Sequence, residues 1–511
     1  MTKRAFEPAH KDVRRHVTAG ILSTGAIQSI KILCQFGSVI ILAHLLSPSD
    51  FGLVAMVGPV IGFVVLFQDL GLSQATVQKT AISHDEINAF FWLNVAMGLA
   101  LSVILMALSP LVGLYYGDQR VVALTVAMGA LVFPSSLANQ HSAILQRRMQ
   151  FGITALIDAV TTLGALATSI VWAIVFGGYW SLYAGMVVGT MTPVIGLWLA
   201  SGWRPSAPRK ISGLRDMLAF GGGLTINNFM GYIGRNMDNV LIGHAWGDQE
   251  LGFYDRAYKL LVFPLQRFVW PLGGVMVPVL SRLLNEPDRY RSAFLKTLGQ
   301  LTLAIWPGIL WALVFSDTLI PVLLGDNWVH AAAIFKPLAV AGLLQVVNNS
   351  AGWLFTSQGR AADFARWGIF YAVTCVGAFV IGLPYGAVGV ATAYAASECL
   401  RLPLLWKYVT RKGPIRACDV GRTLLPQTVS GGIAALVLLG CRHVMANTPT
   451  WLLLGGGIFA SYATAGLVML LFPGGRETIK QTVAFARHSF LQVTAKCQFK
   501  TSVFRNDLNQ P

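Results

Sequence analysis

A small set of basic residues lies inside segments that are otherwise apolar, and these residues are well suited to binding a ligand. They are Lys31, Arg235, Arg256, Lys259, Arg267, Lys336 and Arg401. A cation at the centre of a membrane-spanning helix costs about 2.5–3.5 kcal/mol, so its side chain is expected to face protein or water. Guanidinium and ammonium groups pair well with phosphates and carboxylates. The pattern therefore predicts a site for an anionic substrate.

Polar residues near these cations recur every three or four positions, which places them on one face of a helix. One stripe consists of Thr24, Gln28, Lys31, Gln35 and Ser38. A second consists of Thr225, Asn228, Tyr232, Arg235 and Asn239, and Arg256, Lys259 and Arg267 share a face further along. We predict that the substrate is bound in a cleft by Lys31, Arg235, Arg256, Lys259, Arg267, Gln28, Gln35, Asn228 and Asp238.

Two of these assignments have a structural alternative. Arg235 and Asp238 are three residues apart, so they could neutralise each other as an ion pair on one helix face. Arg256 and Lys259 could instead extend their charged ends to the membrane surface.

The carboxylates in apolar segments also have two interpretations. Asp69, Asp158 and Glu398 could be proton or sodium sites, or they could be partners for basic residues. Apart from coupling to such a gradient, no cofactor is expected. The six cysteines form no CxxC pair, and neither HExxH, GxSxG nor GxxxxGK[ST] occurs. The sequence therefore predicts neither a metal site nor an enzyme.

The composition indicates an integral membrane protein. Of 511 residues, 55% are hydrophobic and only 12% are charged, and the mean hydropathy is +0.61. Soluble domains have about 25% charged residues. The formal net charge of +16 could suggest a nucleic-acid-binding protein, but the basic residues lie in short gaps between apolar runs. Nucleic acid is therefore excluded as a partner.

Fourteen runs are long and apolar enough to cross a bilayer as helices. They cover residues 19–46, 51–77, 87–115, 119–145, 152–176, 179–202, 216–246, 251–281, 294–324, 330–358, 364–383, 386–409, 421–446 and 450–472. The runs lack the alternation of β-strands, so an all-α integral membrane fold is predicted.

The loop charges predict the orientation. Lys and Arg gather in the loops on the side of the N-terminus, whereas the opposite side holds only Arg120 and Arg442. Both termini are therefore expected in the cytoplasm of a bacterium, with the chain in its inner membrane.

The chain also repeats itself at a nearly constant offset. ILAHLLSPSDFGL (41–53) matches LIGHAWGDQELGF (241–253), YYGDQRV (115–121) matches LLGDNWV (323–329), and GGYWSLY (177–183) matches YGAVGVA (385–391) more weakly. A unit of six helices keeps both copies in one orientation, so the repeats are expected to be parallel.

This repeat sets the expected domains. Two six-helix bundles, 19–202 and 216–409, face each other across a cytoplasmic linker, 203–215, so that the polar stripes of 19–46 and 216–246 can line one cleft. A helix pair at 421–472 follows, and 1–18 and 473–511 are a cytoplasmic N-terminal segment and tail.

Several motifs resemble those of bacterial polysaccharide flippases of the multidrug/oligosaccharidyl-lipid/polysaccharide (MOP) superfamily, and above all the Wzx-like exporters of the polysaccharide synthase type. The motifs are LLSPSDFGLVAM (45–56), DLGLSQATVQ (69–78), RNMDNVLIG (235–243), LGFYDRAYKLLVFP (251–264) and VPVLSRL (277–283). The chain departs from the family in having His44 and His244 where arginine is expected.

The resemblance implies a substrate and a mechanism. An undecaprenyl-pyrophosphate-linked oligosaccharide would pass from the cytoplasmic to the periplasmic leaflet by alternating access, with glycosyltransferases and a polysaccharide polymerase as further partners. Arg235 would contact the pyrophosphate. Two alternatives stay open: a multidrug or cation antiporter of the same fold, and a membrane glycan polymerase or ligase. An antiporter is expected to present carboxylates to its substrate, and a polymerase is expected to carry a large periplasmic loop.

Overall fold

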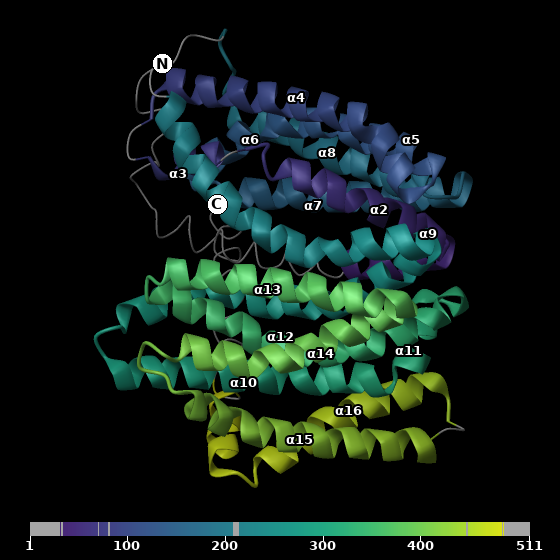
Figure 1. Ribbon diagram of the computed structural model, residues 1–511, viewed down its shortest axis with the longest axis vertical. Helices are drawn as coiled ribbons and strands as arrows, with labels where there is room; N and C mark the ends of the chain where they lie inside the picture. The colour runs from purple at the N-terminus through teal and green to yellow at the C-terminus, as the bar shows by residue number, and fades with distance from the viewer. Residues whose placement is uncertain are drawn as a thin grey trace, which may run out of the picture. The chain divides into compact units, whose positions relative to one another are not determined.

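The computed structural model describes residues 31, 34–69, 71–79, 82–207, 214–445, 448–482 and 484, and for residues 214–230, 268 and 270 it describes the backbone alone. Every regular element among these residues is a helix (Figure 1). This agrees with the all-α fold that the sequence predicts.

The helices follow one another through the described chain with short connections. After a helix over Cys34–Leu45 come α2 (Pro48–Val65), α3 (Leu72–Gln78), α4 (His84–Tyr116), α5 (Gln119–Ala130), α6 (Val132–Arg147), α7 (Phe151–Val175), α8 (Trp180–Ser201), α9 (Leu214–Arg282), α10 (Pro287–Val314), α11 (Ser316–Leu324), η2 (Asp326–Trp328), α12 (Val329–Ser357), α13 (Ala361–Gly382), η3 (Leu383–Tyr385), α14 (Gly386–Val409), α15 (Ala417–Val444) and α16 (Thr450–Met469).

Eleven helical stretches in the described residues are long and apolar enough to span a membrane. Two of them cover parts of two predicted spans each: Gly231–Arg282 covers 231–246 and 251–281, and Ala361–Val409 covers 364–383 and 386–409. Half of the first predicted span, 19–46, lies outside the described residues. The protein is therefore a multi-pass membrane protein, and the count of fourteen crossings stays a prediction.

The predicted span 119–145 consists of α5 and α6, which only Leu131 separates, and two further predicted spans are each broken into two helices. The run 51–77 contains α2 and α3, and α3 starts after Gly71, whose φ of 75° lies in the left-handed region that favours glycine. The run 294–324 contains α10 and α11, which meet at Phe315. Hydropathy misses both breaks because the residues around them are largely apolar.

Helix α9 is 69 residues long and has one interruption, at Gly247, with φ 81° and ψ −172°. This backbone conformation is one that only glycine adopts readily. The break separates two arms, Leu214–Trp246 and Asp248–Arg282, which agrees with the boundary predicted between the spans 216–246 and 251–281.

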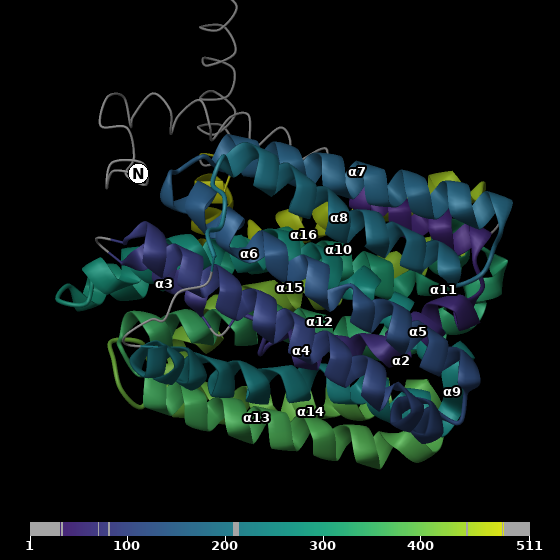
Figure 2. The same ribbon diagram turned by 90° about the horizontal axis from the view of Figure 1, so that it is seen from above.

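The described chain forms two compact units. The first unit consists of the described residues within Met1–Tyr258, Ile320–Ile334 and Ala365–Tyr394. The second consists of those within Lys259–Leu319, Phe335–Phe364 and Ala395–Pro511. In the first unit, α4 packs on α5 and α6, and α7 lies along α8 (Figures 1 and 2). In the second, α15 and α16 pack on each other and on α10. The bundles 19–202 and 216–409, with the segments around them, stay predictions.

Candidate functional site

Arg235 lies in the first arm of α9 with its side chain exposed. The same face of the helix is fixed one turn earlier, because the Tyr232 hydroxyl donates a hydrogen bond to the Pro59 carbonyl of α2, at 2.8 Å. Among the described residues none forms an ion pair with Arg235. The guanidinium is thus held on an anchored helix within a spanning segment, with its charge available to an anion.

Asp238 does not neutralise Arg235. Its side chain is buried, with 4% of the residue exposed, and it accepts a hydrogen bond from the Tyr254 hydroxyl at 2.8 Å. Tyr254 lies beyond Gly247, so this bond joins the two arms of α9. The structural alternative for Arg235, an ion pair with Asp238, is absent from the structure.

Lys31 has a carboxylate partner. Its Nζ atom lies 3.3 Å from Asp158 Oδ2 of α7, and the two side chains are 18% and 55% exposed. Of the two interpretations of Asp158, the structure shows the one in which it pairs with a basic residue. Gln35 lies half-buried in the helix Cys34–Leu45. Gln28, and the side chain of Asn228, lie outside what the structure describes.

The remaining predicted cations have different surroundings. Arg256 is 11% exposed, forms an ion pair with Asp255 at 2.8 Å and lies over the Phe51 ring at 4.1 Å. Its charge is therefore neutralised inside the first unit. Lys259 is exposed and Arg267 is half-buried, and both belong to the second unit.

The other two carboxylates are also engaged in hydrogen bonds. Asp69 accepts from the Ser73 hydroxyl at 2.7 Å and from the Ser73 N–H at 3.2 Å, at the start of α3. Glu398 is 1% exposed, pairs with Arg401 at 2.6 Å and accepts from Asn348 Nδ2 at 2.7 Å. Both arrangements have evident structural roles.

Several polar residues that the sequence analysis missed lie in four segments at helix ends and turns. We call these segments the turn cluster; they are residues 43–53, 115–121, 243–253 and 323–330. Within this cluster, the backbone of segment 43–53 approaches the backbone of segment 243–253 closely at two glycines. A Cβ atom on Gly52 would overlap the carbonyl of Asp248, and one on Gly252 would overlap the carbonyl of Pro48. Positions 52 and 252, and 48 and 248, are equivalent in the internal match 41–53 with 241–253. The two contacts are therefore reciprocal, as a twofold relation between repeats would produce.

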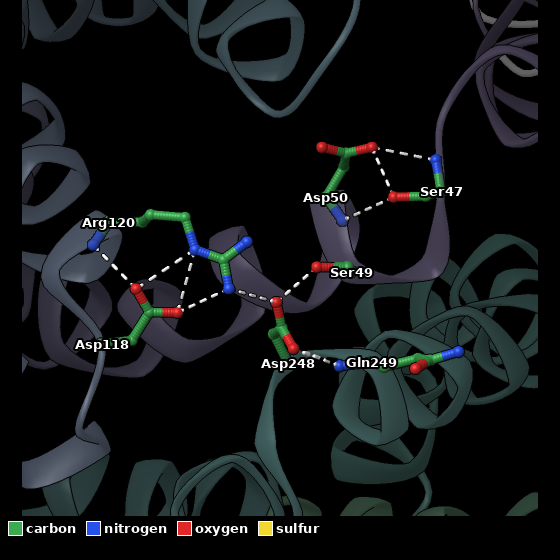
Figure 3. Close-up of polar contacts among 7 residues, drawn as sticks. All are labelled: Ser47, Ser49, Asp50, Asp118, Arg120, Asp248 and Gln249. Atoms are coloured by element: carbon green, nitrogen blue, oxygen red, sulfur yellow. Dashed lines mark hydrogen bonds and ion pairs between the residues drawn. The ribbon is translucent and has the colours of Figure 1, made fainter.

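Charged residues tie the same turns together (Figure 3). The Arg120 guanidinium lies between Asp118, at 2.7 Å, and Asp248, at 2.8 Å, and the Ser49 hydroxyl donates to Asp248. These hydrogen bonds from Arg120 hold the pKa of Asp118 below its usual range. The internal match at 41–53 and 241–253 was the signal that could have identified this site.

The two histidines at positions where the resemblance leads us to expect arginine, His44 and His244, lie in the turn cluster as well. His244 stacks on Tyr115 with ring centroids 4.3 Å apart, and its Nδ1 lies 2.6 Å from the Tyr115 carbonyl oxygen. The His44 ring is adjacent to Gly325. Each histidine thus contacts a turn from the other half of the internal sequence match, so both act in packing the cluster.

The sequence profile of a family described as polysaccharide biosynthesis protein matches residues 41–333, more than half of the chain. The chain belongs to this family. The matched stretch includes α2, Arg235 and the turn cluster, whereas Lys31, Glu398 and Arg401 lie outside it.

Named relatives of this polysaccharide biosynthesis protein agree with the family. The chain is 24% identical to the lipopolysaccharide biosynthesis protein WzxC of Escherichia coli, over 69% of this chain and 73% of WzxC. It is 27% identical to the succinoglycan biosynthesis transport protein ExoT of Rhizobium meliloti, over 74% of this chain and 75% of ExoT.

A solved structure shows the same fold. The lipid II flippase MurJ, in an inward closed conformation, aligns with a TM-score of 0.73 and 11% identity, over 88% of this chain and 98% of MurJ. The predicted resemblance to Wzx-like flippases of the MOP superfamily is thereby confirmed.

Proposed function

We propose that this polysaccharide biosynthesis protein is a flippase that moves a lipid-linked oligosaccharide across the bacterial inner membrane. The carrier is undecaprenyl pyrophosphate, and the movement is from the cytoplasmic to the periplasmic leaflet. The names of WzxC and ExoT and the fold shared with MurJ support a membrane transporter of glycans. Glycosyltransferases would supply the substrate and a polymerase would consume it.

The observation that carries the proposal is the exposed guanidinium of Arg235 in a spanning helix, without an ion pair among the described residues. An uncompensated cation at this depth is costly unless it meets water or an anion. Pyrophosphate supplies such an anion at each transport cycle, while the lipid tail stays in the bilayer. Lys31, which is held by the exposed carboxylate of Asp158, would be the second contact.

A cation antiporter is less consistent with these surroundings. It would need carboxylates that are available to a positive substrate, but Asp158 and Glu398 pair with basic residues and Asp69 binds Ser73. A polymerase would need a long external loop, and the connections in the described chain are short. The proposal therefore involves no enzymatic step and no cofactor, and a proton or sodium gradient would supply the energy.

The test is glycan export in a strain that depends on this protein. A charge-assisted contact to phosphate is worth about 1.5–3 kcal/mol. Arg235→Ala should therefore lower export about tenfold or more while the protein level stays normal. Arg235→Lys, which keeps the charge, should retain more export than Arg235→Ala.

The control uses Asp238, because an ion pair with Arg235 would make the single variant misfold. Asp238 is bonded to Tyr254 instead, so Arg235→Ala combined with Asp238→Asn should not regain export. Normal export from this double variant, at a normal protein level, would refute the substrate role of Arg235.

A further inference from the structure

The turn cluster joins the two repeats at equivalent positions with different chemistry. Arg120 and Trp328 correspond to each other in the internal match of 115–121 with 323–329. The Arg120 side chain is 49% exposed, whereas Trp328 is fully buried. Because the glycine contacts between the repeats are reciprocal, this difference breaks the symmetry of an otherwise symmetric junction.

The side that contains Trp328 is apolar and closed to water. The indole N–H donates to the Ala43 carbonyl at 2.9 Å. The ring packs edge-on against Phe51, at 5.5 Å between centroids, and against Phe253, at 5.9 Å. Trp328 and Phe253 belong to the same repeat, so separating the repeats here would break the contact of Trp328 with Phe51 and leave the buried indole N–H without its acceptor, both of which are unfavourable. We call this the hinge side.

The side that contains Arg120 is polar and reaches solvent. Arg120 crosses from its own repeat to Asp248, and Ser49 crosses to the same carboxylate (Figure 3). Water replaces exposed ion pairs at little cost, and salt screens them. Asp118 would also keep Arg120 paired after Asp248 has left. We call this the latch side.

We infer that the turn cluster is an asymmetric clasp, which opens at Arg120 and stays joined at Trp328. The two repeats would separate on the latch side while the hinge side keeps its aromatic contacts. The inference rests on the proposed function, because a flippase that releases its cargo at the predicted outer face must open that face. It adds which residues part and which do not.

Spin labels on exposed residues of the purified full-length chain test this directly. In a variant whose six cysteines are replaced by alanine, one pair of labels at Gln119→Cys and Gln249→Cys reports the latch side. A second pair at Leu45→Cys and Asn327→Cys reports the hinge side. All four positions are exposed. Each label is adjacent in sequence to a residue whose side chain contacts the other repeat.

Two variants distinguish the behaviour of the latch side from that of the hinge side. Arg120→Ala should raise the long-distance fraction of the latch pair about two- to fivefold, the range expected for an exposed ion pair, and leave the hinge pair unchanged. Trp328→Phe keeps an aromatic ring and loses the N–H donor, and should lengthen the hinge pair. Arg120→Lys, which keeps the charge, should change the latch pair less than Arg120→Ala.

Two outcomes would overturn the inference: both pairs lengthening together in Arg120→Ala, or no change in the latch pair. These distances are measured without a glycan, so they are independent of the export test. Loss of the proposed function would show as normal export from Arg235→Ala, whatever the labels report.

Discussion

At the scale of single residues, Gly52 offers a sharp test of the turn cluster. In Gly52→Ala the new methyl group would overlap the backbone carbonyl of Asp248, which cannot rotate away as a side chain could. Overpacking of this kind costs about 1–3 kcal/mol, so the unfolding temperature of the purified protein should fall. Tryptophan fluorescence during heating measures this.

The matched control is in the same helix. A methyl group on Gly58 meets nothing within 4 Å, and alanine favours a helix over glycine by about 0.8–1 kcal/mol. Gly58→Ala should therefore unfold at the same temperature or higher. Equal unfolding temperatures for the two variants would contradict the close contact at Gly52.

A second prediction at this scale concerns pH. Arg120 lowers the pKa of Asp118, so the Asp118 contribution is fully present above the ordinary pKa of about 3.9 and is lost as the pH falls through the lower folded value. The latch-pair distances of wild type and Asp118→Asn should thus differ by a constant amount from pH 8 to pH 5. The difference should vanish in stronger acid. A difference that disappears near neutral pH would assign the effect to a group other than Asp118.

At the scale of elements, Glu398 links α12 and α14 inside the second unit. It pairs with Arg401 on its own helix and accepts from Asn348 on α12. Glu398→Leu would leave Arg401 as a buried charge without its carboxylate, which should cost about 3–5 kcal/mol of stability. Combining Glu398→Leu with Arg401→Met should restore most of it.

The same pair of variants tests the alternative role of Glu398. If the carboxylate is structural, the double variant should recover both the unfolding temperature and glycan export. A double variant that is stable but exports no glycan would show instead that Glu398 binds the coupling ion.

Several features of the elements could be predicted from the sequence, and others depend on tertiary contacts. Hydropathy located the apolar helices and the break near Gly247. It could not show that Asp238 turns away from Arg235, because its partner Tyr254 comes close only when the two arms of α9 fold back at Gly247. Helical spacing alone placed Asp238 beside Arg235. The partner of Lys31 likewise lies on a distant helix.

At the scale of the whole molecule, the loop charges predict that both termini are cytoplasmic. Reporter fusions after Lys210 and after Arg416 should both read cytoplasmic, because these sites follow the sixth and twelfth predicted spans. A reporter active only in the periplasm provides the control. Activity of that reporter at either site would overturn the orientation and the even number of crossings before it.

The turns of the cluster are also very short. Only Gly117 and Asp118 separate α4 from α5. The two arms of α9 are separated by a single non-helical residue, Gly247. Proteases and inserted segments need exposed loop tips. With these turns in the periplasm, as the charge asymmetry predicts, the turn cluster would present almost no loop to a periplasmic protease, or to an antibody added after the outer membrane has been removed. Detection would then require single-residue chemical labels, because an epitope inserted here would split the junction between the repeats.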